Sequence, residues 1–230
     1  RPLDYTTGRV FVGGGGGAGD QNDGDGGAGG RGGGLCFIMS YGTVGGTGVI
    51  NANGNAGTNS LASGGAFVGK DGAGGGGGGG SVIINSNSTI SGITINANGG
   101  LGGNQNFNIA AMGVDAYGPG GGGGGGYIAI SNGAPTRNAN GAANGTTNSL
   151  GFTEFPPKGA TSGNTGLPTS AYSNYYFTLA NQTICYNTAA TLTATIFGTV
   201  PGGTTLNWYA TQFGTVSLGT GASFKTPVLT

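Results

Sequence analysis

The chain has 230 residues, of which 59 are glycine, and its seven basic and seven acidic residues give a formal net charge of zero. Seven scattered Lys and Arg residues do not form the basic stripe that nucleic-acid binding requires, and no apolar run is long enough for a transmembrane helix. Hydrophobic residues make up 35% of the chain, which argues against a wholly disordered tail, and the lack of a strict Gly-X-Y period excludes collagen.

The first part of the chain contains a recurring pattern. An opening RVFVGGGGG at 9–17 is followed by the strand-like blocks LCFIMS, SVIINS and YIAISN, which begin at Leu35, Ser81 and Tyr127, each 46 residues after the one before (35, 81, 127). Glycines precede each block, and a related Asn-Gly motif follows it, at 49–57, 94–103 and 137–145. A period of this length is typical of stacked architectures. We therefore predict a glycine-rich β-repeat domain over residues 1–150.

The blocks themselves predict strands. In SVIINS, Val82 and Ile84 fall on one face and Ile83 on the other, so both faces carry apolar residues and both are expected to be covered. Helical periodicity is missing, and glycine disfavours a helix by about 1 kcal/mol per residue. The predicted fold class is all-β.

Two runs of seven glycines, at 74–80 and 120–126, lead directly into these strands. Glycine can form the extended threefold helix of polyglycine II, which rises about 3.1 Å per residue, as polyproline II does, and can bond laterally to its neighbours. The alternative is a set of flexible surface loops. The equal spacing of the blocks favours the first interpretation, because slack loops tolerate insertions.

The acidic residues cluster only at DQNDGDG, residues 20–26. Calcium loops place oxygen ligands at alternating positions, and Asp20 and Asn22 fit the first two, whereas Asp25 falls one place late and no bidentate Glu follows. The alternatives are a calcium site formed by Asp20, Asn22 and Asp25, with calcium as the single cofactor considered, and a solvated turn.

Glycine runs alternating with SVIINS…ISGITINANGG resemble the glycine-rich repeats of bacterial surface and adhesin-like proteins, and similar bundles occur in tail-fibre tip adhesins of some bacteriophages. This resemblance covers about residues 9–145 and implies an extracellular or surface role. Segments between glycine runs, such as 104–118, would then carry specificity, with Phe107, Met112 and Tyr117 as contact residues.

The composition changes after about Ser149. Residues 151–176 contain three prolines and few strand signals, which predicts a linker or an extended covering segment. From residue 177 onward, alternating strands and turns about ten residues apart predict a β-sandwich. The aromatic residues just before and at this boundary are expected to cover its core, or else to stack on sugars or pack on a neighbour: Tyr172, Tyr175, Tyr176 and Phe177.

The sequences QTICYNTAATLTAT and LNWYATQFGTVSLGTGASFKTPVLT resemble the Ig-like modules of surface adhesins that Bacteroidota export through the type 9 system. The resemblance implies that Trp208 and Tyr209 lie on a core strand and that SLGTGASF forms a hairpin turn. That family normally continues into one further strand beyond TPVLT. We therefore expect an incomplete module, either because the chain is a fragment or because a strand of another subunit completes it by β-augmentation.

Reactive side chains are few. The sequence lacks histidine, which removes Ser-His-Asp and Cys-His mechanisms, and no paired-carboxylate motif is present, so we do not expect an enzyme. Cys36 and Cys185 are far apart and lack metal-type spacing; they form either an extracellular disulfide or two separate buried thiols.

These patterns predict an extracellular structural and adhesive protein of a bacterial surface that associates with itself or with neighbouring modules to form a fibre or filament. The alternative is a tip that binds a cell-surface glycan or receptor. A filament subunit would lose assembly when residues of 104–118 are changed, whereas a binding tip would lose binding and keep assembly.

Overall fold

The computed structural model describes residues 10–21, 26–60, 71–105, 118–147, 159–172, 175–180, 182–198, 205–211 and 214–229. Within these ranges the chain consists of β-strands and extended segments without a helix, so the all-β prediction is confirmed for this part. The chain divides into two compact units, Arg1–Tyr172 and Ser173–Thr230, called here the glycine-rich unit and the C-terminal unit.

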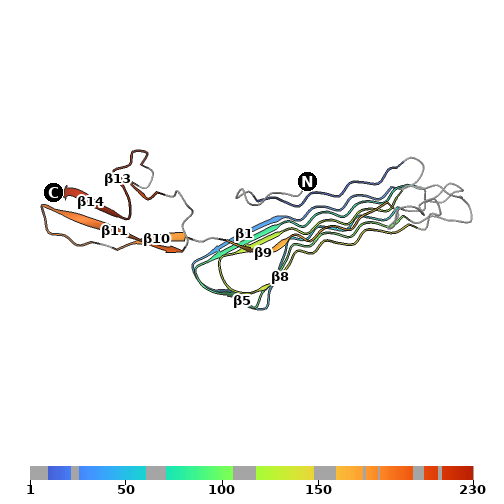
Figure 1. The fold of residues 1–230 in the computed structure, drawn as a ribbon, viewed down its shortest axis with the longest axis horizontal. Coiled ribbons are helices and arrows are strands. Elements are labelled where there is room, and N and C mark those ends of the chain that lie inside the picture. Colours follow the sequence, from blue (N-terminus) through green and yellow to red (C-terminus); the bar gives the residue numbers. More distant parts are fainter. Residues whose placement is uncertain are drawn as a thin grey trace, which may run out of the picture. The chain divides into compact units, whose positions relative to one another are not determined.

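The strands of the glycine-rich unit pair in parallel. They are arranged in three sheets, with orders β1-β4-β7-β9, β2-β5 and β3-β6-β8 (Figure 1). Their bounds are β1 Leu35–Ser40, β2 Val44–Gly45, β3 Val49–Asn51, β4 Ser81–Ser86, β5 Ile90–Ser91, β6 Thr94–Asn96, β7 Tyr127–Ile130, β8 Thr136–Asn138 and β9 Leu167–Ala171.

The spacing of the sequence blocks reappears in the register of the first sheet. Leu35 lies opposite Ser81, and Ser81 lies opposite Tyr127, so residues 46 positions apart are neighbours. All six residues of β4 are buried, as the apolar residues on both of its faces predict. Parallel strands covered on both sides need such continuous burial.

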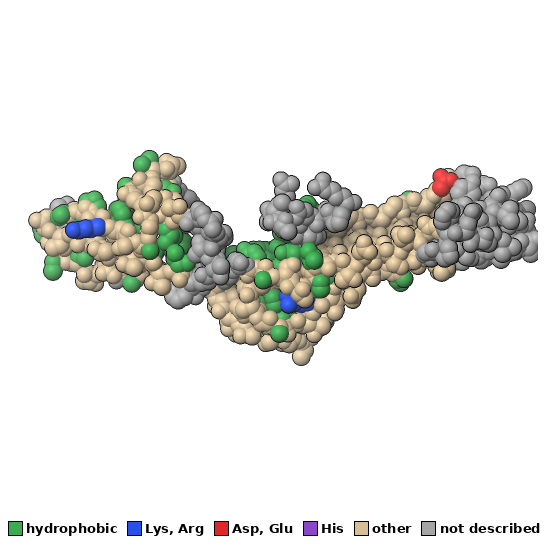
Figure 2. Space-filling model, viewed as in Figure 1, with side chains coloured by type: hydrophobic (Ala, Val, Ile, Leu, Met, Phe, Trp, Pro, Cys, Tyr) green, Lys and Arg blue, Asp and Glu red, His purple; other side chains and the backbone are tan. Residues whose placement is uncertain are grey.

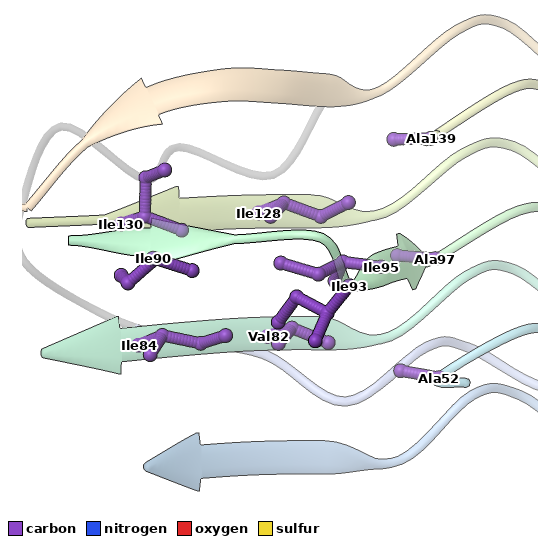
Figure 3. Close-up of a cluster of buried hydrophobic side chains, with 10 residues drawn as sticks. All are labelled: Ala52, Val82, Ile84, Ile90, Ile93, Ile95, Ala97, Ile128, Ile130 and Ala139. Carbon is purple, nitrogen blue, oxygen red and sulfur yellow. The ribbon is translucent and has the colours of Figure 1, made fainter. Parts of the chain in front are cut away.

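The hydrophobic core lies between the β1-β4-β7-β9 sheet and the shorter strands that follow in each turn of the chain (Figure 3). Ile84 from β4, Ile128 from β7, Ile90 from β5 and Ile95 from β6 are completely buried there. On β1, Ile38 points inward and packs against this core. β-branched residues suit this position because they pack well on a pleated surface.

Asparagine side chains form rows along the β3-β6-β8 sheet. The Asn96 amide donates to Asn51 Oδ1 at 2.9 Å, and the Asn138 amide donates to Asn96 Oδ1 at 2.9 Å. A second row forms where the backbone N–H groups of Asn98 and Asn140 donate to the side chains of Asn53 and Asn98, both at 2.8 Å. The Asn-Gly motifs of the sequence therefore hold successive turns of the chain in register.

Beyond the strands, the chain continues as extended segments that run side by side and form the long part of this unit, called here the glycine bundle (Figure 1). A middle layer contains the segments that lead into β1, β4, β7 and β9. The segments that leave β3, β6 and β8 lie on one side of it, and segment 10–21 lies on the other. The middle-layer segments are residues 26–34, 71–80, 118–126 and 159–166. The segments that leave β3, β6 and β8 are residues 52–60, 97–105 and 139–147.

Backbone hydrogen bonds hold the glycine bundle together. In the run 74–80, successive N–H groups point to three different neighbouring segments, and the direction returns after three residues. The carbonyl acceptors for residues 74 to 79 are, in order, those of Thr58, Gly17, Gly121, Asn55, Gly14 and Gly124, at 2.8–3.0 Å. The run therefore bonds to segments on several sides, unlike a β-strand, whose neighbours lie in one plane.

The glycines inside the bundle have no room for a side chain. A Cβ at Gly77 would overlap the carbonyl oxygen of Arg31, and a Cβ at Gly123 would overlap that of Gly77. At Gly78 the nearest atom outside its chain neighbours would be 3.5 Å away, which is an ordinary contact. Close packing therefore requires glycine at some positions of the run and not at others.

The segment that the sequence indicates as a linker, residues 151–176, contains a strand of the glycine-rich unit. β9 pairs in parallel with β7, with Tyr127 opposite Leu167. Its side chains alternate between exposed and half-buried, which marks an edge strand. Residues Leu167–Ala171 are therefore part of the first sheet of the glycine-rich unit.

The C-terminal unit has a three-stranded antiparallel sheet of order β10-β11-β14 and a two-stranded pair, β12-β13. Trp208 lies on β12 and is half-buried; its ring stacks on Phe224 at a centroid distance of 5.6 Å, and its Nε1 donates to the Gly221 carbonyl at 2.8 Å. Gly221 has φ of 101°, a left-handed conformation that suits the turn within SLGTGASF. The bounds are β10 Tyr175–Leu179, β11 Thr188–Gly198, β12 Asn207–Trp208, β13 Gly219–Thr220 and β14 Ser223–Leu229.

Candidate functional site

The fold brings several chain ends together at the end of the glycine bundle that lies away from the strands. At this end, called here the tip, the chain leaves the described segments at residues 21, 60, 105 and 147 and re-enters them at 26, 71, 118 and 159. Hydrogen bonds join these borders: Gly72 N–H donates to the Asp20 carbonyl at 3.0 Å, and Ala73 N–H donates to the Gly118 carbonyl at 3.1 Å. The ends of segments that are far apart in the sequence therefore lie close together at the tip.

Buried polar side chains lie at the base of the tip. Gln105 is fully buried; its Nε2 donates to the Asp71 backbone carbonyl at 3.3 Å, and its Oε1 accepts a hydrogen bond from Thr147 Oγ1 at 2.8 Å. Asp71 is also fully buried, and Ser60 is 2% exposed. The hydroxyl of Ser60 has no hydrogen-bond partner among the residues that the structure describes.

Polar burial of this kind costs free energy unless each group finds a partner. The opposite end of the unit, in contrast, is filled by Ile and Val side chains. Sequence analysis did not single out Asp71, Gln105 or Thr147. The signal was their place in the sequence, since each is a polar residue at the border between a glycine-rich segment and a segment of different composition.

The predicted contact residues Phe107, Met112 and Tyr117 lie outside the described residues, as do Asn22 and Asp25 of the predicted calcium loop. Asp20 is described; it lies at the tip and its side chain is exposed. Within the described ranges, no three His, Cys, Asp or Glu residues come together in a way that could hold a metal ion. The calcium site at Asp20, Asn22 and Asp25 stays a prediction.

A second candidate site is an apolar groove of about 470 Å³ in the C-terminal unit. Its lining combines Ala194, which is 7% exposed, with Phe177 and Leu179 of β10, which are more than half exposed. The strand β12 and the residues next to it also contribute. The full lining is Phe177, Leu179, Ala194, Leu206, Asn207, Trp208, Tyr209, Ala210 and Thr211.

The aromatic residues at the predicted domain boundary separate in the structure. Tyr172 belongs to the glycine-rich unit, where its ring meets Phe37 edge-on at a centroid distance of 6.5 Å. Phe177 lines the groove of the C-terminal unit instead. The structure therefore places Tyr172 against the glycine-rich unit and not in the core of the C-terminal module.

The cysteines fit neither of the two alternatives that the sequence left open. Both are free thiols. Cys36 is half-buried on β1 and packs against the hydrophobic core, whereas Cys185 is exposed in the C-terminal unit. The disulfide is not formed in the structure. The alternative of two buried thiols is wrong because Cys185 is exposed.

The outer face of β1 exposes large hydrophobic side chains. Leu35, Phe37 and Met39 are each more than half exposed, while the alternating Cys36 and Ile38 face the core. Figure 2 shows hydrophobic side chains gathered in this region, while polar side chains and backbone cover most of the glycine bundle. No helix in the described part of the chain has the length and hydropathy to cross a membrane.

Comparison with known proteins identifies one part of the chain. Residues 173–230 match the family described as "Ig-like domain CHU_C associated", and this range coincides with the C-terminal unit. No curated protein and no solved structure matches the chain. The C-terminal unit is therefore an Ig-like module of the type found in Bacteroidota proteins.

Proposed function

We propose that this chain is an extracellular structural and adhesive protein of a bacterial surface, and that it assembles with itself into a fibre or filament. The Ig-like module supports this proposal because modules of its type occur in secreted and surface proteins. An Ig-like domain and a strand-built architecture also suggest a structural part rather than a catalytic one. The low charge of the chain leaves few long-range repulsions between copies.

The glycine-rich unit would serve as the stiff element of such an assembly, as a bundle of polyglycine II helices. One observation carries this part of the proposal: the N–H groups of run 74–80 turn to three different segments with a period of three residues. A threefold extended helix presents its polar groups in this way. A segment bonded on several sides cannot bend without breaking hydrogen bonds, each worth about 1 kcal/mol net.

Electron microscopy of the full chain, purified without denaturation, tests the proposal. We expect regular filaments with an axial repeat. The matched control is the Gly77→Ala variant, which should disturb the bundle and remove the filaments. Isolated particles at every protein concentration examined would contradict self-assembly.

The tip supports a second candidate function, binding of a glycan or receptor. The supporting observation is the meeting of several chain borders above the buried polar residues Asp71, Gln105 and Thr147. A rigid scaffold that carries adjacent loops at one end is a common way to build a binding surface. The described segments that end at residue 105 and begin again at residue 118 both reach the tip.

A glycan array probed with the full chain tests this second candidate. We expect a restricted set of glycans to bind, and we expect Phe107→Ala and Tyr117→Ala to lose that binding while assembly continues. The control is Tyr41→Ala, because Tyr41 is 84% exposed in the turn that follows β1, at the other end of the unit. Binding that survives both loop variants would exclude this role for the segment.

A further inference from the structure

Segment 10–21 fills a groove on one face of the middle layer of the glycine bundle. The groove lies between segments 26–34 and 71–80, and both of its sides bond to the segment. Segment 10–21 donates three hydrogen bonds to carbonyls of 26–34 and accepts three from N–H groups of 71–80, at 2.8–3.0 Å. The carbonyls belong to Gly27, Gly30 and Gly33, and the N–H groups to Gly72, Gly75 and Gly78.

The next groove of the same layer, between segments 71–80 and 118–126, offers the same pattern of groups 46 residues further along the chain. It is called here the open groove. Its carbonyls are those of Ala73, Gly76 and Gly79, and its N–H groups are those of Gly118, Gly121 and Gly124. None of these six groups has a hydrogen-bond partner within the part of the chain that the structure describes. The open groove therefore has the same arrangement of donors and acceptors as the neighbouring groove, where they hold segment 10–21.

Glycine at the open groove is not explained by packing within the chain. A Cβ at Gly121 would lie 3.4 Å from the Thr161 carbonyl oxygen, and one at Gly124 would lie 3.6 Å from that of Asn164, so alanine would fit at both. The two glycines are only half-buried. The corresponding glycines of the filled groove, Gly75 and Gly78, would place a Cβ 3.5 Å from segment 10–21, so a side chain at residue 121 or 124 would point toward a segment that lies in the open groove.

The exposed side of segment 10–21 also carries glycines that packing within the chain does not require. A Cβ at Gly14 or Gly17 would meet nothing within 4 Å, whereas a Cβ at Gly13 or Gly16 would overlap a carbonyl oxygen of 71–80. The fold of one copy thus requires glycine at every third position, yet residues 13–17 are all glycine. The N–H groups of Gly14 and Gly17 also have no partner among the described residues.

We propose that two copies of this chain associate face to face, with the glycine segment 13–17 of each copy lying in the open groove of the other. The segment supplies unpaired N–H groups for the groove carbonyls and unpaired carbonyls for the groove N–H groups. Both features lie on the same face of one chain, so the contact is self-complementary, as in two-fold symmetric dimers. The proposal rests on the self-association proposed above and names the surface of one such contact; because a two-fold contact closes on itself, a filament needs a second contact elsewhere on the chain.

Sedimentation velocity of the full chain over a wide concentration range, with three matched double variants, tests this contact. Gly121→Leu with Gly124→Leu places side chains that extend beyond Cβ in the open groove, and Gly14→Leu with Gly17→Leu places them on the docking segment. The control pair alters Gly42 and Gly48 to leucine, in the turns on either side of β2, where a Cβ would also meet nothing within 4 Å. Far-UV circular dichroism checks that each variant is folded.

We expect the wild type and the control pair to associate, and we expect each of the other two pairs to weaken association by roughly 100-fold or more, because several hydrogen bonds are lost together. In the associated wild type, the amides of residues 118–126 should exchange hydrogen more slowly than in the groove variant. If all variants assemble like the wild type, the groove contact is overturned and self-assembly stands. If the wild type stays monomeric throughout, self-assembly itself is overturned as well.

Discussion

The strongest test of the glycine bundle compares two adjacent glycines in one run. Gly77→Ala should destabilise the glycine-rich unit, because its Cβ would overlap the Arg31 carbonyl and push segment 26–34 away. Gly77 itself donates to the Asn55 carbonyl at 2.9 Å and accepts from Gly100 N–H at 2.8 Å. Losing two to four backbone bonds costs about 2–4 kcal/mol, and the overpacking adds about 1–3 kcal/mol.

Gly78→Ala should instead stabilise the glycine-rich unit. Its Cβ would lie 3.5 Å from Gly14 N, an ordinary contact, and Gly78 has no positive φ. Alanine narrows the unfolded ensemble, so we expect the free energy of unfolding to rise by about 0.4–1 kcal/mol. The free energies of unfolding of the Gly77→Ala and Gly78→Ala variants should therefore differ by about 3–8 kcal/mol, which is a large share of the stability of a typical domain.

Urea unfolding of the full chain, followed by far-UV circular dichroism, measures this difference. The single tryptophan, Trp208, lies in the C-terminal unit, so its fluorescence gives an internal control that should stay unchanged in both variants. Hydrogen exchange of residues 97–105 adds a local measure, because Gly100 N–H donates to Gly77. Equal stabilities of Gly77→Ala and Gly78→Ala, within about 0.5 kcal/mol, would refute the assigned packing.

Three further predictions concern the core, the Ig-like module and the thiols. Ile84→Ala should lower the free energy of unfolding of the glycine-rich unit by about 2–5 kcal/mol, since Ile84 is fully buried; a small loss in urea unfolding would contradict the core assignment. Trp208→Phe should keep the aromatic stack but lose the bond to Gly221, costing about 0.5–1.5 kcal/mol, measured as a lower melting temperature of the C-terminal unit, and an unchanged value would argue against that bond. A maleimide should label Cys185 quickly in the native protein and Cys36 slowly, as peptide mass spectrometry can show; equal rates would disagree with their different exposure.

Several features of the fold follow from local sequence. The β-branched block SVIINS, apolar on both faces, predicts a strand buried on both sides, and β4 is such a strand. SVIINS lies 46 residues after LCFIMS and 46 before YIAISN, and residues 46 positions apart are paired in the sheet. The Ig-like module could also be predicted, because the residues around Trp208 resemble a known family and the family match covers 173–230.

Other features depend on contacts between distant residues. β9 has little strand signal of its own, and it becomes a strand because the edge of β7 offers unpaired backbone groups. The buried polar residues at the tip gain their role in the same way, since Gln105 meets Thr147 and Asp71 only when three segments lie together. No local pattern contains that information.

The amino-acid sequence by itself determined the all-β class, the spacing of the strands and the glycine content of the segments between them. Only the tertiary structure decided which glycines are indispensable. In a run of seven identical residues, Gly77 and Gly78 have the same local sequence, and what separates them is the segment that each one faces, Arg31 in one case and Gly14 in the other. The physical reason is the period of three: it turns successive residues toward different neighbours, and those neighbours come from distant parts of the chain.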